Sequence, residues 1–197
     1  MKRNYLFVDG SNFNAGQYDL FGPNKYLDFS EFVKHVEKLL NIKFSKIYFY
    51  ASFSPIPDNP TVRQKKYLKN EGMFYKNVTS VKKLEFFKGY RSKTSGKEKE
   101  VDVKLAVDIV DMVHRDKFDC LYLISGDADF MHALKVVENK GKKIRIITLQ
   151  NRIPYRFSYL YKTYIFAIDS KAKDLGLNRR QKVTIFQLKT EELTGEI

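Results

Sequence analysis

The 197-residue sequence holds one cysteine, three histidines and no long uninterrupted apolar segment. A single thiol, Cys120, cannot form an internal disulfide, and three scattered histidines beside it do not match a zinc site. No run of 18 or more uncharged apolar residues is present, so the sequence offers no transmembrane helix. The apolar segment before Asp9 is too short for the core of a signal peptide. We therefore expect a soluble, cytoplasmic protein that does not enter a membrane.

Basic residues are in excess, with 36 Lys and Arg against 23 Asp and Glu, a formal net charge of +13. The excess lies mainly in residues 61–100 (12 basic, 4 acidic) and 150–182 (8 basic, 2 acidic), which flank a balanced, aspartate-rich segment. Charge runs are usually solvated surface, but basic residues interleaved with aromatics are also typical of polyanion binders. Because the basic residues of 88–97 sit in a Gly/Ser loop rather than on an amphipathic helix, nucleic acid is favoured over a membrane. The predicted nucleic-acid contacts are Lys88, Arg91, Lys93, Lys97, Lys99, Arg152 and Arg156.

Short apolar segments alternate with amphipathic ones, which predicts an α/β sandwich with a mainly parallel central sheet. Strands are predicted at 5–8, 46–51, 73–78, 84–87, 120–124 and 143–148, with an extra strand or docking segment at 183–190. Helices are predicted from Asp28, from Asn59-Pro60 to Gly72, over 101–115, and from Asp127 to Gly141. Residues 1–170 are expected to form one domain, and residues 171–197 a basic linker and C-terminal tail.

Acidic residues follow two of the predicted strands and begin one helix. Asp9 follows the first strand, Asp127 and Asp129 follow the strand at 120–124, and Asp102 begins the helix at 101. Ligands of open α/β sheets bind outside the carboxyl ends of the strands, where parallel neighbours bring such residues together. Gathered carboxylates repel one another unless a cation neutralises them, and an oxygen-only set suits Mg²⁺ or Mn²⁺. Such a cation clamps phosphate oxygens and activates water.

Each of these acids also has a purely structural interpretation. Asp9 is equally suited to an Asx turn, and Asp127 and Asp129 to an N-cap and a first-turn acid. For Asp102 the functional interpretation leads, because an aspartate at the start of an apolar stripe faces the core and needs a partner. Asp108 lies six residues, about 9 Å, further along the helix, so it is assigned a supporting role or plain helix polarity.

Four motifs occur in order: Phe7-Val-Asp-Gly-Ser-Asn12, Lys99-Glu-Val-Asp-Val-Lys-Leu-Ala-Val-Asp108, Ile124-Ser-Gly-Asp-Ala-Asp-Phe130 and Lys140-Gly-Lys-Lys-Ile-Arg145. Together they resemble the NYN-domain family of PIN-like ribonucleases, and more closely its LabA-like branch, over residues 3–170. The chain departs from the family at one step, because Lys99-Glu100 stands where Lys-Gly is common.

The resemblance implies a PIN-like Rossmannoid three-layer sandwich and divalent-metal-dependent cleavage of RNA. The implied catalytic set is Asp9, Asn12, Asp102, Asp127 and Asp129, with Mg²⁺ or Mn²⁺ held by Asp9, Asp102 and Asp127 and supported by Ser11, Asp108 and Ser125. The alternative is a catalytically weak RNA-binding or assembly protein that keeps the fold. The C-terminal tail is a candidate contact for a second copy or a protein partner.

Overall fold

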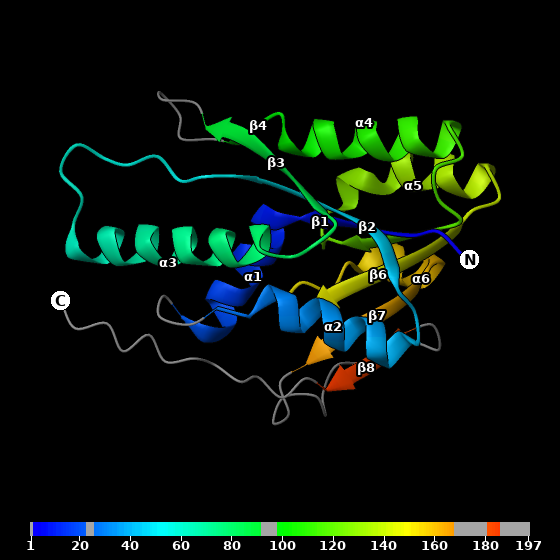
Figure 1. Ribbon diagram of the computed structural model, residues 1–197, viewed down its shortest axis with the longest axis horizontal. Coiled ribbons are helices and arrows are strands. Elements are labelled where there is room, and N and C mark those ends of the chain that lie inside the picture. Colours follow the sequence, from blue (N-terminus) through cyan, green and yellow to red (C-terminus); the bar gives the residue numbers. More distant parts are fainter. Residues whose placement is uncertain (1, 23–25, 92–97, 168–180, 186–197) are drawn as a thin grey trace.

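The computed structural model describes residues 2–22, 26–91, 98–167 and 181–185, and its described part contains an eight-stranded sheet (Figure 1). The strands are β1 (Asn4–Asp9), β2 (Phe44–Ser52), β3 (Leu84–Arg91), β4 (Glu98–Lys99), β5 (Cys120–Ile124), β6 (Lys143–Leu149), β7 (Lys162–Ala167) and β8 (Gln181–Ile185). Their order is β4-β3-β2-β1-β5-β6-β7-β8. All neighbours pair in parallel except β3 and β4, which are antiparallel. The predicted mainly parallel sheet is confirmed.

Helices cover both faces of this sheet, which confirms the three-layer α/β architecture. The helices are α1 (Gly10–Phe21), α2 (Phe29–Leu40), α3 (Val62–Thr79), α4 (Val101–His114), the 3-10 helix η1 (Ala128–Phe130), α5 (Met131–Asn139) and α6 (Tyr155–Leu160). In Figure 1, α4 and α5 lie on one side of the sheet and α1, α2 and α3 on the other. None of the helices in the described ranges combines the length and the apolarity that crossing a membrane requires.

Each face of the sheet has its own aromatic-rich core. On the α1–α3 face, the centre of the Phe13 ring lies 5.3 Å from the centre of the Phe32 ring and 6.2 Å from that of the Phe74 ring. On the other face, Phe7 packs against Phe118, and the buried stripe of α4 lies over them. That stripe is Val101, Leu105, Ile109 and Val113. Cys120 is 1 % exposed, as expected of a core residue. The strands are therefore held from both sides, and their carboxyl ends are fixed in space.

The predicted strand at 73–78 is wrong, because these residues continue helix α3 to Thr79. Gly72 does not end the helix, since its φ is not positive. Phe74, Tyr75 and Val78 are buried at helical spacing, so the apolar face continues past the glycine. Tertiary packing of this face outweighs the weak helix propensity of one glycine and the β propensity of its aromatic neighbours.

Other boundaries also differ from the prediction. Asp9-Gly-Ser-Asn12 is not only a turn, because Asp9 caps helix α1, which begins at Gly10. Asp127 caps the 3-10 helix that leads into α5. Gly141, the predicted end of this helix, lies just after α5 and has a φ of 69°. β8 includes the first residues of the segment expected at 183–190, and residues 186–190 lie outside the described ranges, as do 171–180.

Gly10 provides a test of how tightly the start of α1 packs against β2. A Cβ at this position would lie 2.2 Å from Cε1 of Phe49 and 2.7 Å from the carbonyl oxygen of Tyr50. Since that carbonyl belongs to a central strand and cannot move freely, Gly10→Ala should lower the free energy of unfolding by about 1–3 kcal/mol. Urea denaturation measures the change.

Gly72→Ala is the matched control, because a Cβ there would meet nothing within 4 Å. Alanine in a helix is favoured over glycine, so this variant should be more stable by about 0.5–1 kcal/mol. Equal effects of the two substitutions would contradict the packing described here.

Candidate active site

The carboxyl ends of three adjacent strands bring Asp9, Tyr50 and Ser125 to one edge of the sheet. Asp9 is paired in register with Tyr50 on β2, and Val8 with Ile124 on β5, so Asp9 and Ser125 are neighbours. Side chains alternate between faces along a strand. Asp9 lies two residues after Phe7, and Ser125 two after Leu123, both of which belong to the α4–α5 core. The two side chains therefore share the face that α4 covers.

Asp9 is only 3 % exposed, and its carboxylate is held at both oxygens. Oδ1 accepts a hydrogen bond from the backbone N–H of Asn12 at 3.0 Å, and Oδ2 accepts one from the hydroxyl of Ser125 at 2.8 Å. The first contact is the N-cap of α1, where the positive end of the helix dipole stabilises a negative charge. Hydrogen bonds of this kind satisfy a buried carboxylate and fix its orientation.

Ser125 and Asn12 connect the two loops that follow β1 and β5. The Ser125 oxygen accepts a hydrogen bond from the backbone N–H of Asp127 at 3.0 Å. The side-chain oxygen of Asn12 accepts one from the backbone N–H of Gly126 at 3.1 Å. Asp127 in turn accepts a hydrogen bond from the N–H of Asp129 at 2.9 Å. Asp9, Asn12, Ser125 and Asp127 thus form one connected group, which we call the strand-end corner.

The remaining predicted residues lie around this corner. Asp129 is exposed on η1, and Ser11 is half-buried in the first turn of α1. Asp102 is exposed, so the expectation that it faces the core is wrong. The apolar stripe begins at Val101, four residues before Leu105, and this register turns Asp102 outwards.

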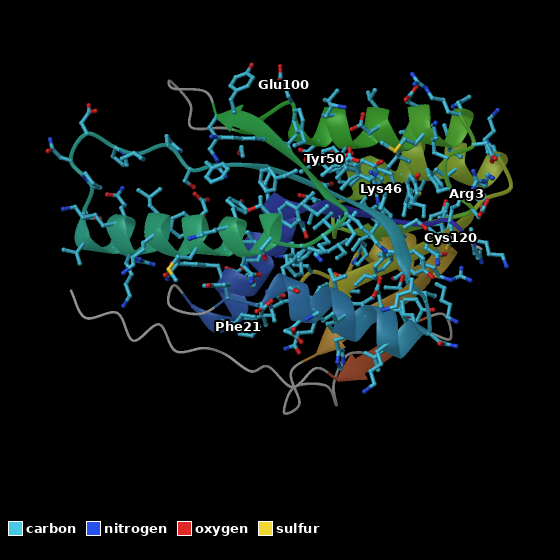
Figure 2. All side chains as sticks on the ribbon, viewed as in Figure 1. Arg3, Phe21, Lys46, Tyr50, Glu100 and Cys120 are labelled. Atoms are coloured by element: carbon cyan, nitrogen blue, oxygen red, sulfur yellow. The ribbon has the colours of Figure 1, made fainter. Side chains whose placement is uncertain are left out.

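Asp108 is the acid of α4 that turns inwards. Its Oδ2 accepts a hydrogen bond from the Tyr50 hydroxyl at 2.8 Å, and its Oδ1 pairs with Lys104 one turn away. Burial, and then the hydrogen bond to Asp108, raise the pKa of Tyr50 well above its usual range, so Tyr50 stays a neutral donor. Tyr50 lies between the sheet and α4 (Figure 2). Asp108 thereby anchors α4 to β2.

The donor atoms of the corner can be tested against a divalent cation. Among the described residues, no three His, Cys, Asp or Glu side chains are grouped so as to hold a metal ion, and Asp102 does not join Asp9 and Asp127. Mg²⁺, however, usually keeps several waters and binds one or two carboxylates together with substrate phosphates. The corner carries two carboxylates, Asp9 and Asp127, and their oxygen atoms are the donor type that Mg²⁺ or Mn²⁺ prefers. They do not fit a closed cage made by protein alone.

The predicted nucleic-acid contacts that the structure describes fall into two sets. Beside β2, the Lys88 ammonium lies 4.5 Å from the centre of the Phe53 ring, and Nε of Arg91 donates to the Ser52 hydroxyl at 3.1 Å. On the other side, Arg152 forms an ion pair with Asp19 at 2.5 Å, and Arg156 is exposed on α6. Lys93, Lys97 and the side chain of Lys99 lie outside the described residues.

Sequence patterns did not reveal several residues around the corner. Tyr50 and Ser52 are ordinary strand residues in the sequence, and only the register of β2 beside β1 places them here. Gln150, Asn151 and Ile153 follow β6 and line a pocket with Asn12, Gly126 and Arg152. For the residues after β6, the one signal in the sequence was that they directly follow a predicted parallel strand, where ligands of such sheets bind.

Glu100 shows what the departure from Lys-Gly means for the backbone. It lies at the start of α4 (Figure 2) and has a φ of 71°, in the left-handed region that favours glycine. Glu100→Gly should therefore remove backbone strain of about 1–2 kcal/mol. The added freedom of glycine in the unfolded chain offsets part of this gain, which leaves a net stabilisation of about 0.5–1 kcal/mol.

Chemical denaturation of Glu100→Gly beside Glu31→Gly checks this expectation. Glu31 lies in the first turn of α2, where no left-handed backbone is required, so its replacement by glycine should destabilise by about 1 kcal/mol. Loss of stability in both variants would mean that residue 100 is not strained.

Comparisons with known proteins agree with this architecture. The family model described as NYN domain matches residues 3–168. A 48-residue stretch is 35 % identical to Uncharacterized protein MJ0482 of Methanocaldococcus jannaschii and covers 24 % of this chain. The chain spans only 20 % of that relative's length. The crystal structure of a protein of unknown function, VPA0982, from Vibrio parahaemolyticus has a TM-score of 0.61 at 18 % identity, covering 85 % of this chain and 93 % of that one. At this identity the likeness shows the fold alone.

Proposed function

Because the chain belongs to the NYN domain family, whose model matches residues 3–168, we propose that it is a divalent-metal-dependent endoribonuclease. NYN domains belong to the PIN-like nuclease superfamily, so RNA is the substrate that the family suggests. The observation that carries the proposal is the Ser125 hydroxyl. It donates to Asp9 Oδ2 at 2.8 Å and accepts from the Asp127 N–H at 3.0 Å, so it joins the acidic loops of two parallel strands.

Each residue of the corner has a distinct proposed role. Asp9 and Asp127 hold the cation, and Ser125 fixes the orientation of the Asp9 carboxylate. Asn12 holds the β5–η1 loop through Gly126 and presents its amide to the phosphate. Asp129 orients the attacking water from the exposed side. A bound Mg²⁺ or Mn²⁺ supplies neutralisation of the phosphate charge and a more acidic water. Asp102, which is exposed on α4, would be the third ligand that the family resemblance implies.

Basic residues on either side of the corner bind the RNA backbone. Lys88 and Arg91 lie on β3, the second strand from β1, and Arg156 lies on α6, beyond β6. A single strand that crosses the carboxyl edge of the sheet passes both sets. Ser52 and Phe53 hold the two β3 cations in place, which lowers the entropy lost when they contact phosphate.

The alternative function, a catalytically weak RNA-binding or assembly protein, is favoured by one observation. The described residues do not gather three carboxylates in one group, and such a site depends on substrate to bind its cation. The two functions differ in whether the aspartates are needed for cleavage or whether the protein binds RNA without cutting it.

Removing the charge of Asp9 or Asp127 distinguishes the nuclease from the assembly protein. Asp9→Asn and Asp127→Asn keep the side-chain size but remove the charge that holds the cation, so cleavage of labelled single-stranded RNA with Mn²⁺ should fall at least about a hundredfold. RNA affinity measured in EDTA should stay unchanged, since the basic residues supply it. Single-turnover rates and fluorescence anisotropy give the two quantities.

Asp111→Asn is the matched control, because Asp111 pairs with Arg115 on the exposed side of α4. It should cut RNA at the wild-type rate. A wild-type protein that binds RNA but cuts no substrate with Mg²⁺ or Mn²⁺ would support the assembly function. Undiminished cleavage by both corner variants would show that the activity arises elsewhere.

The β3 cations can be tested by salt dependence. Binding to single-stranded RNA should weaken with salt at a slope of about −0.7 for each phosphate neutralised. Replacing Lys88 and Arg91 by alanine should flatten the slope of log K against log salt by about 1.4. Replacing Lys34 and Lys38, which are exposed on α2, removes the same charge and should leave the slope nearly unchanged. Identical slopes for the two double variants would exclude a specific contact at β3.

A further inference from the structure

A polar pocket of about 400 Å³ adjoins the strand-end corner. It is lined by Asn12, Gly126, Gln150, Asn151, Arg152 and Ile153. These residues come from the start of α1, the loop after β5 and the loop after β6. Its volume is within the range of small-ligand sites. Because Asn12 belongs to both the corner and the pocket, a ligand in the pocket lies beside the phosphate that the corner is proposed to hold.

The pocket wall is preformed. The side chain of Asn151 donates to the carbonyl of Gly16 at 2.9 Å, and the Thr148 hydroxyl donates to the carbonyl of Arg152 at 2.5 Å. A Cβ on Gly126 would lie 2.5 Å from the same carbonyl oxygen, so the two loops meet at a distance that only glycine permits. A ligand that enters the pocket therefore does not need to order this loop first.

Arg152 leaves one donor in this wall without an acceptor. Its Nη2 is paired with Asp19 on α1, whereas its Nε–H is buried and has no partner among the described residues. Buried donors are almost always hydrogen-bonded, so the unpaired Nε–H of a residue that lines a pocket favours a ligand acceptor that meets it when the Arg152 side chain turns towards the pocket.

The charge and donor set select the kind of ligand. The Asp19 carboxylate offsets the positive charge of Arg152, so the pocket is close to neutral. Three of its residues carry amides, which offer acceptors as well as donors. A phosphate has only acceptors and would face amide oxygens, whereas the edge of a nucleobase combines donors and acceptors, as amide side chains do. The flat guanidinium of Arg152 can also stack on a base.

We propose that this pocket binds one nucleobase of the RNA, next to the phosphate at the strand-end corner, and so sets a base preference. The inference rests on the proposed function for the nature of the substrate. It adds that this side of the site recognises a base rather than a second phosphate. Arg152 Nε, Asn12 and Gln150 are then specificity-determining groups.

Nuclear magnetic resonance in EDTA tests the pocket without any cleavage. The four uncharged ribonucleosides and inorganic phosphate are titrated separately into the ¹⁵N-labelled protein, and the signals of Arg152 Nε–H, Gly126 N–H and the Asn and Gln side-chain amides are followed. We expect nucleosides to shift these signals, with one base binding at least about tenfold more tightly than the weakest. Shifts caused by phosphate but not by nucleosides, or by neither, would overturn the proposal.

Arg152→Lys keeps a positive charge opposite Asp19 but removes the Nε–H, so the preference among bases should fall to within about twofold. Gln150→Ala provides a second variant that leaves the Arg152–Asp19 ion pair in place. Arg115→Lys, which changes an exposed ion pair with Asp111 on α4, is the control and should keep the wild-type preference. An unchanged preference in both pocket variants would contradict the assignment. Since no step requires hydrolysis, a protein that never cuts RNA can still pass or fail this test.

Discussion

The parallel pairing of β1 with β5 is the constraint on which the candidate site depends. It places Ser125 beside Asp9, and the 2.8 Å hydrogen bond between them keeps a carboxylate that is 3 % exposed from being unsatisfied. The same hydroxyl accepts the N–H of Asp127, so the position of one buried side chain fixes the loop that carries the second acid. A shift of either strand by one residue would turn these side chains to the opposite face of the sheet.

Packing on both faces preserves this register. Phenylalanine and tyrosine rings fill the α1–α3 face, and the stripe of α4 covers the other, where Tyr50 links β2 to Asp108. Gly10 lets α1 start against β2 without a clash, and its N-cap is Asp9 itself. The residue that caps the helix therefore also lies in the strand-end corner. Asp9 therefore has two structural contacts, the N-cap of α1 through Oδ1 and the Ser125 hydroxyl through Oδ2.

The sequence predicted the layers, the parallel sheet and the meeting of Asp9 with the residues after β5, because short apolar segments and strand-end acids depend on local pattern and topology. It failed at residues 73–78, where aromatic content suggested a strand and only packing decides for the helix. It also placed Asp102 towards the core, since a stripe starting at 101 or at 102 cannot be distinguished before the helix is docked. Tyr50, Gln150, Asn151 and Ile153 were not predicted, because their position near the corner depends on neighbours distant in sequence. The roles of the aspartates in metal binding remain predictions.

Paramagnetic Mn²⁺ tests most directly whether the strand-end corner is where the cation binds. Substoichiometric Mn²⁺ added to ¹⁵N-labelled protein broadens the amide signals nearest the bound ion. We predict that signals of residues 9–12 and 125–129 broaden first, and that Asp127→Asn abolishes the effect. Amides near Asp116 and Asp119, carboxylates already paired with Arg3 at 3.0 and 2.6 Å, should stay sharp. Broadening that begins at Asp116 and Asp119, or that persists unchanged in Asp127→Asn, would contradict it.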